Sequence, residues 1–178
     1  MCPARAHRSA LLVLPLVDVL DEVDADADAL LDAHGLDRGR IRDASLRLPA
    51  AVVNEMFSAA EDLATDRAIG ARAGLSIRRG VLDVFDYAVR SAATLGDAWD
   101  FAAQFNGLLD DAYKRTLRIE GERAFLEYHR AAGDADGFAE FVLTAVGTVA
   151  RQMTGQILTA ERVTLRRDID GAGAALFT

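Results

Sequence analysis

The sequence predicts an α+β fold: a helical first half, then a β-hairpin, a long buried helix and a further strand. Two observations carry this prediction. Apolar residues recur every three or four positions as far as about residue 112, and every two positions just after it. Glu120-Gly121-Glu122 then separates two alternating segments, as expected of a tight hairpin turn. The strands are expected to form a small, mostly antiparallel sheet packed on the helices.

Two features predict the helices of the first half: apolar residues at helical spacing, and residues suited to the ends of helices. Ser9 can cap a helix that runs to about residue 23, and Pro15 suits its first turn. Gly35 ends the next helical segment, and Pro49 stands at the first turn of another. Helices are therefore expected in residues 9–23, 26–34, 49–65, 66–77, 81–92 and 95–113.

The second half contains the hairpin, the long helix and the last strand. The alternation predicts hairpin strands over residues 113–120 and 123–130. An apolar stripe from Phe138 to Ile157 follows at helical spacing, and a second apolar row beside it indicates a helix buried on much of its circumference. Residues 162–167 alternate again and predict a third strand, with Val163 and Leu165 on one face.

Composition and charge exclude several classes of protein. The chain is 51% hydrophobic and 27% charged, which is typical of a globular protein rather than a disordered one. Its net charge of −8 repels the phosphates of nucleic acids and of anionic membranes. Cys2 is the only cysteine, so an intrachain disulfide is impossible and a reducing cytoplasm is expected. The apolar run after Arg5 and Arg8 is too short to span a bilayer and fits a buried helix better than a signal peptide.

The stretch "DADADALLDAHG" has the alternating acids of a calcium loop but not its other requirements. An EF-hand needs glycine at the sixth position and glutamate at the twelfth, and counting from Asp24 these are Ala29 and Gly35. Asp26 or Asp28 instead suits the N-terminus of the following helix, where a carboxylate accepts free backbone N–H groups. The three histidines are scattered without the spacing of a zinc site. We therefore expect no metal.

Catalytic motifs are also missing from the sequence. There is no G-x-S-x-G, no P-loop and no G-x-G-x-x-G, and no serine has a local partner that would make it a nucleophile. We therefore expect a protein that is not an enzyme and needs no cofactor.

Aromatic residues form the one set of candidate site residues. The chain has few aromatics, and many of them fall between Phe85 and Phe141. Core packing explains most of them, but ligand pockets are also largely apolar and aromatic. If a ligand pocket exists, the sequence places it between the helices and the hairpin, bounded by some of Phe85, Trp99, Phe105, Tyr113, Tyr128 and Phe141.

Several short motifs occur in the order that a known family shows. The matching positions are Leu48-Pro49, Gly80, Tyr87, Ser91, Thr94-Leu95, Ala98, Leu108-Leu109 and Glu140, with an acid-preceded helix at "DADALLDAHGL". In these features the chain resembles the amino-terminal effector-binding, or arabinose-binding-like, domain of bacterial AraC-type transcriptional regulators. The resemblance is to the subgroup with ornithine-utilisation and mycobacterial virulence regulators. The chain departs from the pattern at Phe85-Asp86, where Leu-Gly is usual, and near Arg167-Asp168, where His-Pro is usual.

This resemblance implies a binding module. Residues 1–178 would form a single regulatory domain that senses a small-molecule effector and forms a homodimer, although no residue identifies a sugar. DNA would be contacted only through a C-terminal helix-turn-helix domain, so the chain is expected to be a fragment of a longer regulator or a naturally shortened relative. An oligomerisation or interaction domain without a ligand is the alternative, and a closed apolar cavity would favour sensing over it.

We expect calcium not to stabilise this protein, because the Asp24 series lacks the turn glycine and the terminal glutamate. Thermal melts with and without millimolar calcium measure this directly. A rise in melting temperature that Asp26→Ala and Asp28→Ala abolish would contradict the capping interpretation.

Overall fold

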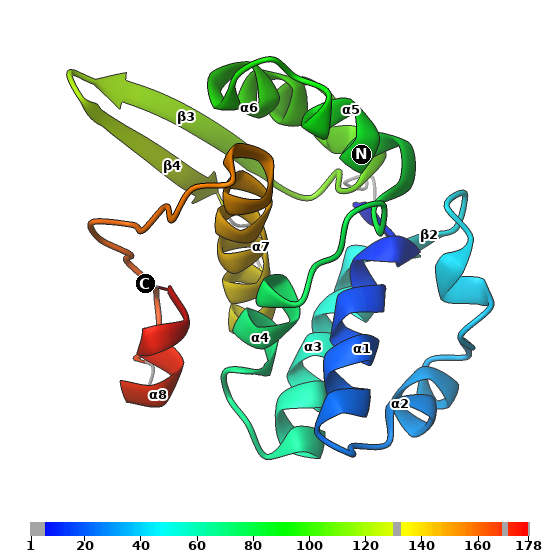
Figure 1. Ribbon diagram of the computed structural model, residues 1–178. Helices are drawn as coiled ribbons and strands as arrows, with labels where there is room; N and C mark the ends of the chain where they lie inside the picture. The colour runs from blue at the N-terminus through cyan, green and yellow to red at the C-terminus, as the bar shows by residue number, and fades with distance from the viewer. Residues whose placement is uncertain (1–5, 130–132, 169–170, 178) are drawn as a thin grey trace.

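The computed structural model describes residues 6–129, 133–168 and 171–177, and it has the predicted α+β class (Figure 1). Cys2 and Arg5 lie outside the described residues. The α-helices are α1 Leu14–Glu22, α2 Ala27–Ala33, α3 Ala50–Ala64, α4 Ile69–Leu75, α5 Asp83–Arg90, α6 Leu95–Gln104, α7 Asp136–Thr154 and α8 Gly171–Ala174. The strands are β1 His7–Ser9, β2 Arg47–Pro49, β3 Lys114–Glu120 and β4 Arg123–His129. Short 3₁₀ helices are η1 Ala10–Val13, η2 Arg40–Arg42, η3 Asn106–Leu108 and η4 Ala175–Phe177.

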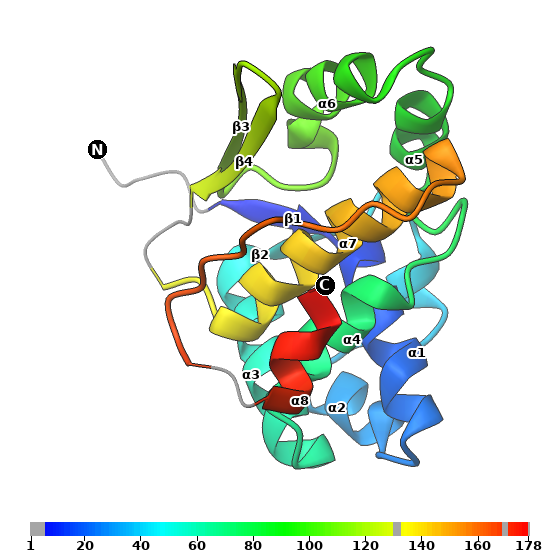
Figure 2. The same ribbon diagram turned by 60° about the vertical axis from the view of Figure 1, so that its left-hand side comes forward.

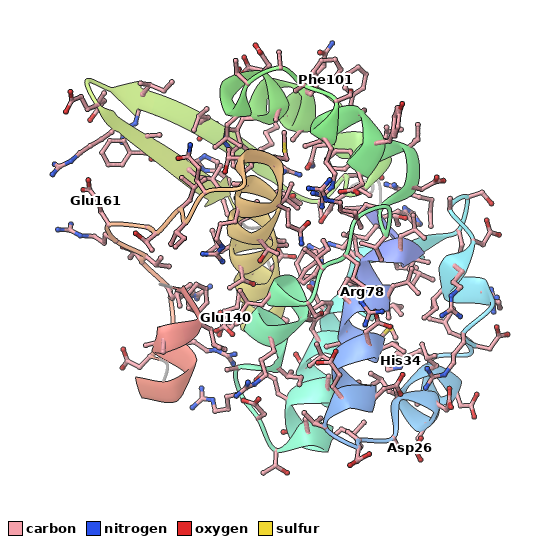
Figure 3. All side chains as sticks on the ribbon, in the orientation of Figure 1. Asp26, His34, Arg78, Phe101, Glu140 and Glu161 are labelled. Carbon is pink, nitrogen blue, oxygen red and sulfur yellow. The ribbon has the colours of Figure 1, made fainter. Side chains whose placement is uncertain are left out.

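The predicted caps of the first helices are confirmed. The Ser9 hydroxyl accepts the Leu11 N–H at the start of η1, and Pro15 lies in the first turn of α1. One carboxylate oxygen of Asp26 accepts the Ala29 N–H at 2.9 Å, so this aspartate is the N-cap of α2. The acidic stretch that resembles a calcium loop therefore begins a helix at the lower edge of the molecule (Figure 3).

The strands form two separate two-stranded antiparallel sheets. In the predicted hairpin, β3 pairs with β4 from Lys114 opposite His129 to Glu120 opposite Arg123. Gly121 occupies the turn with φ +61°, a conformation that favours glycine. The hairpin extends away from the helices, and the second sheet joins β1 to β2 near the chain start (Figure 1). The sequence analysis did not predict the β1–β2 pair.

Two predictions for the last part of the chain are wrong. The long helix does not include Ile157, because Gly155 takes the left-handed conformation and ends α7, leaving Ile157 92% exposed. Residues 162–167 do not form a strand, because no described segment pairs with them. Instead the Arg167 side chain fixes this segment to the helices through the carboxylates of Glu140 and Glu61. The alternation of Val163 and Leu165 therefore has no ladder to support it.

Helix α7 is central to the core, and α4 lies directly against it (Figures 1 and 2). Two glycines four residues apart make this close approach possible. A Cβ atom on Gly70 would stand 2.1 Å from the Gly137 carbonyl oxygen, and one on Gly74 would stand 2.4 Å from the Phe141 carbonyl oxygen. On another side of α7, Phe138 and Phe141 pack on Phe57 of α3, with ring centroids 5.2 and 5.4 Å apart. The helical core is thus assembled on α7.

A buried arginine joins the start of the chain to this core. The Arg8 side chain is fully buried, and its guanidinium lies 3.8 Å from the centre of the Phe138 ring. Its Nε donates to Asp110 and one Nη to Asp134, both at 2.6 Å, and its other Nη donates to Asn54 at 2.6 Å. One side chain therefore ties β1 to the loop before β3, to the loop before α7 and to α3.

The α4–α7 contact predicts a large effect of one methyl group. We expect Gly74→Ala to lower the free energy of unfolding by about 1–3 kcal/mol or more, because the added Cβ meets the α7 backbone, which cannot rotate away. Chemical denaturation measures this loss.

Gly147→Ala on α7 is the matched control. Its Cβ would meet only the end of the Arg151 side chain, at 3.7 Å, so this change should stabilise the helix by about 0.5–1 kcal/mol. If Gly74→Ala and Gly147→Ala had equal free energies of unfolding, the close contact between α4 and α7 would be contradicted.

Candidate functional site

A small apolar pocket, called here the inner pocket, lies where α5, α6, α7 and the start of β3 meet. Its volume is about 70 Å³. Most of its walls are aliphatic or aromatic, and α7 supplies the longest wall. The lining residues are Leu12, Ile77, Leu82, Phe85, Asp86, Val89, Trp99, Ala102, Leu109, Tyr113, Arg115, Phe141, Val142, Ala145, Val146 and Val149.

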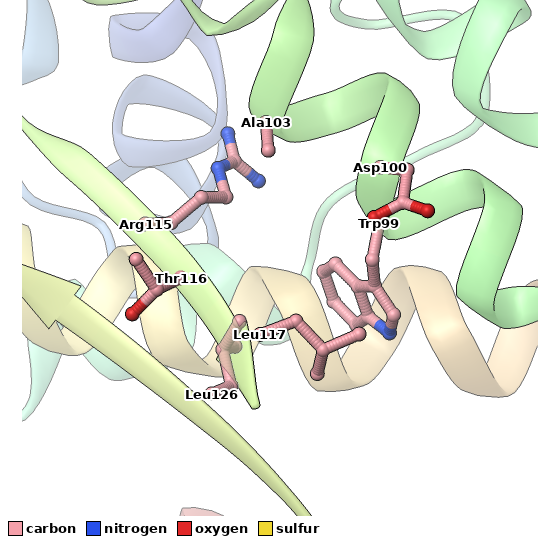
Figure 4. Close-up of a pocket in the computed structure, with 7 residues that line it drawn as sticks. All are labelled: Trp99, Asp100, Ala103, Arg115, Thr116, Leu117 and Leu126. Carbon is pink, nitrogen blue, oxygen red and sulfur yellow. The ribbon is translucent and has the colours of Figure 1, made fainter. Parts of the chain in front are cut away.

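A second pocket, the outer pocket, lies between α6 and the hairpin and has a volume of about 230 Å³. Figure 4 shows Trp99, Asp100 and Ala103 from α6 facing residues of β3 and β4 across it. Trp99 and Arg115 line both pockets. These two side chains therefore stand at the junction between an apolar site and a more polar one.

The structure brings four of the six predicted residues together around the inner pocket: Phe85, Trp99, Tyr113 and Phe141. Phe105 and Tyr128 line neither pocket. Phe105 is 40% exposed and stacks on Phe101 at the molecular surface, with ring centroids 5.6 Å apart. The four residues that do line the inner pocket lie between the helices and the hairpin because β3 packs against α6.

Tyr128 belongs to the Arg8 network instead. Its hydroxyl donates to Asp134 at 3.1 Å, and its ring centroid lies 4.5 Å from that of Tyr113. Tyr128 therefore does not line the inner pocket, but its ring packs against Tyr113, which does.

Asp86 supplies a buried carboxylate to the inner pocket wall, and it is already fully engaged. It is 3% exposed and accepts the Gly80 N–H at 2.5 Å and the Arg90 Nε–H at 2.7 Å. Gly80 has φ +84°, a conformation that favours glycine, so the loop before α5 is shaped to reach this carboxylate. The two Nη atoms of Arg90 are buried without a hydrogen-bond acceptor among the described residues.

Arg115 supplies the positive charge, and its guanidinium hydrogen-bonds to an uncharged group, while the carboxylates of Asp86 and Asp100 line the same pockets. Its Nη2 and Nε donate to the Asn106 amide oxygen at 2.8 and 3.3 Å. Its guanidinium carbon lies 5.5 Å from the centre of the Tyr113 ring and 5.9 Å from that of Phe85. Burial raises the pKa of the Tyr113 phenol to about 12, so this neighbour is neutral near pH 7.

Asn106 is fixed in turn. Its amide nitrogen donates to the backbone carbonyls of Asp110 and Tyr113, at 2.7 and 3.2 Å, so its oxygen is directed at Arg115. Neither Arg115 nor Asp86 was predicted from the sequence as a pocket residue. The predicted alternation does place Arg115 on the same strand face as Tyr113, and this shared face could have indicated that Arg115 lies at the pocket.

Other kinds of site find no support in the part of the chain that the structure describes. There, no group of three or more His, Cys, Asp or Glu side chains is arranged to hold a metal ion. No helix in these residues has the length and hydropathy needed to cross a bilayer.

Comparison with protein families decides the identity of the domain. The model of the arabinose-binding domain found at the N-terminus of AraC transcription regulators matches residues 25–176. The chain belongs to this family. No curated protein matches the chain. This arabinose-binding domain is a part of transcription regulators and not an enzyme, and its match includes every inner-pocket residue except Leu12.

Proposed function

We propose that this arabinose-binding-type domain senses a small-molecule effector that binds in the inner pocket and extends into the outer one. The observation that supports this proposal is the apolar pocket bounded by α5, α6, α7 and β3, with Asp86 and Arg115 as its charged groups. Ligand sites commonly combine an apolar lining with a few oriented polar groups. We assign no DNA contact to these residues, since their net charge of −8 repels the duplex.

Helix α7 offers a route from the pocket to the segment that follows it. Phe141 faces the inner pocket, while the neighbouring Glu140 accepts two hydrogen bonds from Arg167, at 2.7 and 2.9 Å. Arg167 also donates to Glu61 of α3 at 2.8 Å. A ligand that favours one position of α7 would thereby favour one position of the Arg167 segment, which is a population shift between two arrangements. Figure 3 shows Glu140 on the side of α7 that faces this segment.

Within the family, we place the chain with the ornithine-utilisation and virulence regulators. The order of Gly80, Tyr87 and Ser91 supports this placement. Gly80 has a structural reason to be glycine, because its backbone N–H is donated to Asp86 from a left-handed conformation.

A cavity-filling variant tests the sensing proposal. We expect Ala102→Leu to keep or raise the melting temperature and to abolish the response to any effector, because an isobutyl group replaces a methyl group at the inner pocket. Thermal melts in a metabolite screen measure both properties.

Ala33→Leu on α2 is the control, because it makes the same substitution at an exposed residue that lines neither pocket. The sensing proposal fails if no metabolite shifts the wild-type melt, or if Ala102→Leu responds as the wild type does.

A second candidate function is self-association, and exposed apolar residues of α5, α6 and η3 favour it. Tyr87 is 78% exposed and Phe101 42% exposed, and Figure 3 shows Phe101 on the outer side of α6. Exposed apolar residues that cluster on adjacent elements often mark an interface. The others in this group are Val84, Phe105 and Leu108. We propose a homodimer formed through this group.

Sedimentation velocity tests the dimer. Tyr87→Glu combined with Phe101→Glu should convert dimers to monomers, because each protomer would bury two unpaired carboxylates in the interface. Ile157→Glu, an equally apolar and exposed position elsewhere, should leave the association unchanged. A monomeric wild-type protein would rule out this second function.

A further inference from the structure

Given the proposed sensing function, we infer that the effector is a small carboxylic acid with an unbranched or lightly branched apolar tail. Its carboxylate would bind Arg115 in the outer pocket, and its tail would occupy the inner pocket. This assigns a chemical class to the ligand and a specificity-determining role to one residue.

The first support is the position of Arg115. It is one of two residues that line both pockets, so a ligand spanning them must pass its guanidinium. Figure 4 shows the guanidinium on the α6 side of β3, near Ala103. The apolar walls lie on one side of this point, and the larger and more polar outer pocket lies on the other. A molecule with an anionic head and an apolar tail matches this order of surfaces.

The second support is that the charge of Arg115 is not balanced within the described residues. Arg8, Arg90 and Arg167 are also wholly or largely buried, and each of them forms an ion pair with a carboxylate. Arg115 forms none in the described part of the chain, and its hydrogen-bond acceptor is the neutral Asn106 amide. A half-buried guanidinium without a counterion is a favourable partner for an incoming carboxylate, which it can bind through two parallel hydrogen bonds.

The third support comes from what the pockets disfavour. A sugar would bring several hydroxyl groups into the inner pocket, where most walls are aliphatic or aromatic and Asp86 is already hydrogen-bonded. Unpaired polar groups there would be costly. A cavity of about 150 Å³ admits benzene, so the 70 Å³ of the inner pocket suits a tail end of about three carbons. The rest of a six-carbon acid would lie in the outer pocket, beside Trp99.

Trp99 provides the measurement. It is the only tryptophan of the chain and lines both pockets, so its emission reports on either of them. Titration of the protein with hexanoate should change the Trp99 emission and raise the melting temperature. Hexan-1-ol has the same tail without the charge, and acetate has the charge without the tail. Hexan-1-ol should bind about tenfold more weakly or worse because it cannot form charge-assisted hydrogen bonds with Arg115. Acetate should be weaker by a similar factor because it has no apolar tail to bury in the inner pocket.

Variants of β3 localise the charge. Arg115→Met should weaken hexanoate binding about tenfold or more, while Arg115→Lys should keep part of it because the charge remains. Arg118→Met is the matched control: it removes the same charge from an exposed position on the other face of the same strand. Since the alcohol and acetate comparisons use the wild-type protein, the inference remains testable even if Arg115→Met folds poorly.

The possible outcomes separate this inference from the proposed function. If hexan-1-ol binds as tightly as hexanoate, or if Arg115→Met binds hexanoate normally, the anionic class is overturned and the pocket remains an effector site. If hexanoate does not bind while another metabolite stabilises the wild type and not Ala102→Leu, the carboxylic-acid class is also wrong. Only a complete lack of response in the metabolite screen overturns the sensing function as well.

Discussion

The structure depends on a guanidinium group that is removed from water at the start of the chain. Arg8 binds Asp110 just before β3 and Asp134 just before α7, so the two segments that flank the hairpin are fixed to the same side chain. Burying a charged pair is costly, and breaking one leaves an uncompensated charge at a cost of about 3–5 kcal/mol. The network therefore contributes less to net stability than to geometry: it determines where the hairpin leaves the helical core and hence where Arg115 lies relative to α7.

Much of the fold could be predicted because local chemistry agrees with the final structure. The N-cap at Asp26, the proline before α3 and the glycine of the hairpin turn act within a few residues, so the sequence reveals them. The β1–β2 pair could not be found in this way. Each strand has three residues, too few for a period, and their pairing depends on the burial of Arg8 between distant segments.

The residues of the candidate site also include some that could be predicted from the sequence and some that could not. Phe85, Trp99, Tyr113 and Phe141 were found because aromatic side chains are few and fall on elements that must share a core. Phe105 was misplaced because helix α6 ends there, and its ring turns to the surface against Phe101. Arg115 and Asp86 were missed because charged residues are normally solvated, and only the three-dimensional packing shows that these two face an apolar pocket.

Phe85 and Asp86, the positions at which the sequence departs from the pattern of the subgroup that it resembles, both line the inner pocket. A change of side chains at a pocket wall can alter which ligand fits without disturbing the frame around it. The frame here is the α4–α7 crossing. It contains no pocket residue of α4, although Phe141 and Ala145 of α7 both line the pocket and pack against Gly74.

That crossing has a consequence for how such chains can diverge. Position 74 of α4 faces backbone atoms of α7, and backbone is common to all residue types, so substitutions on α7 cannot make room for a side chain there. Gly70 and Gly74 therefore form a pair whose spacing is required by this arrangement of helices. A pair of glycines about one helical turn apart, some sixty-five positions before a long helix, is therefore the sequence pattern that this crossing of helices requires.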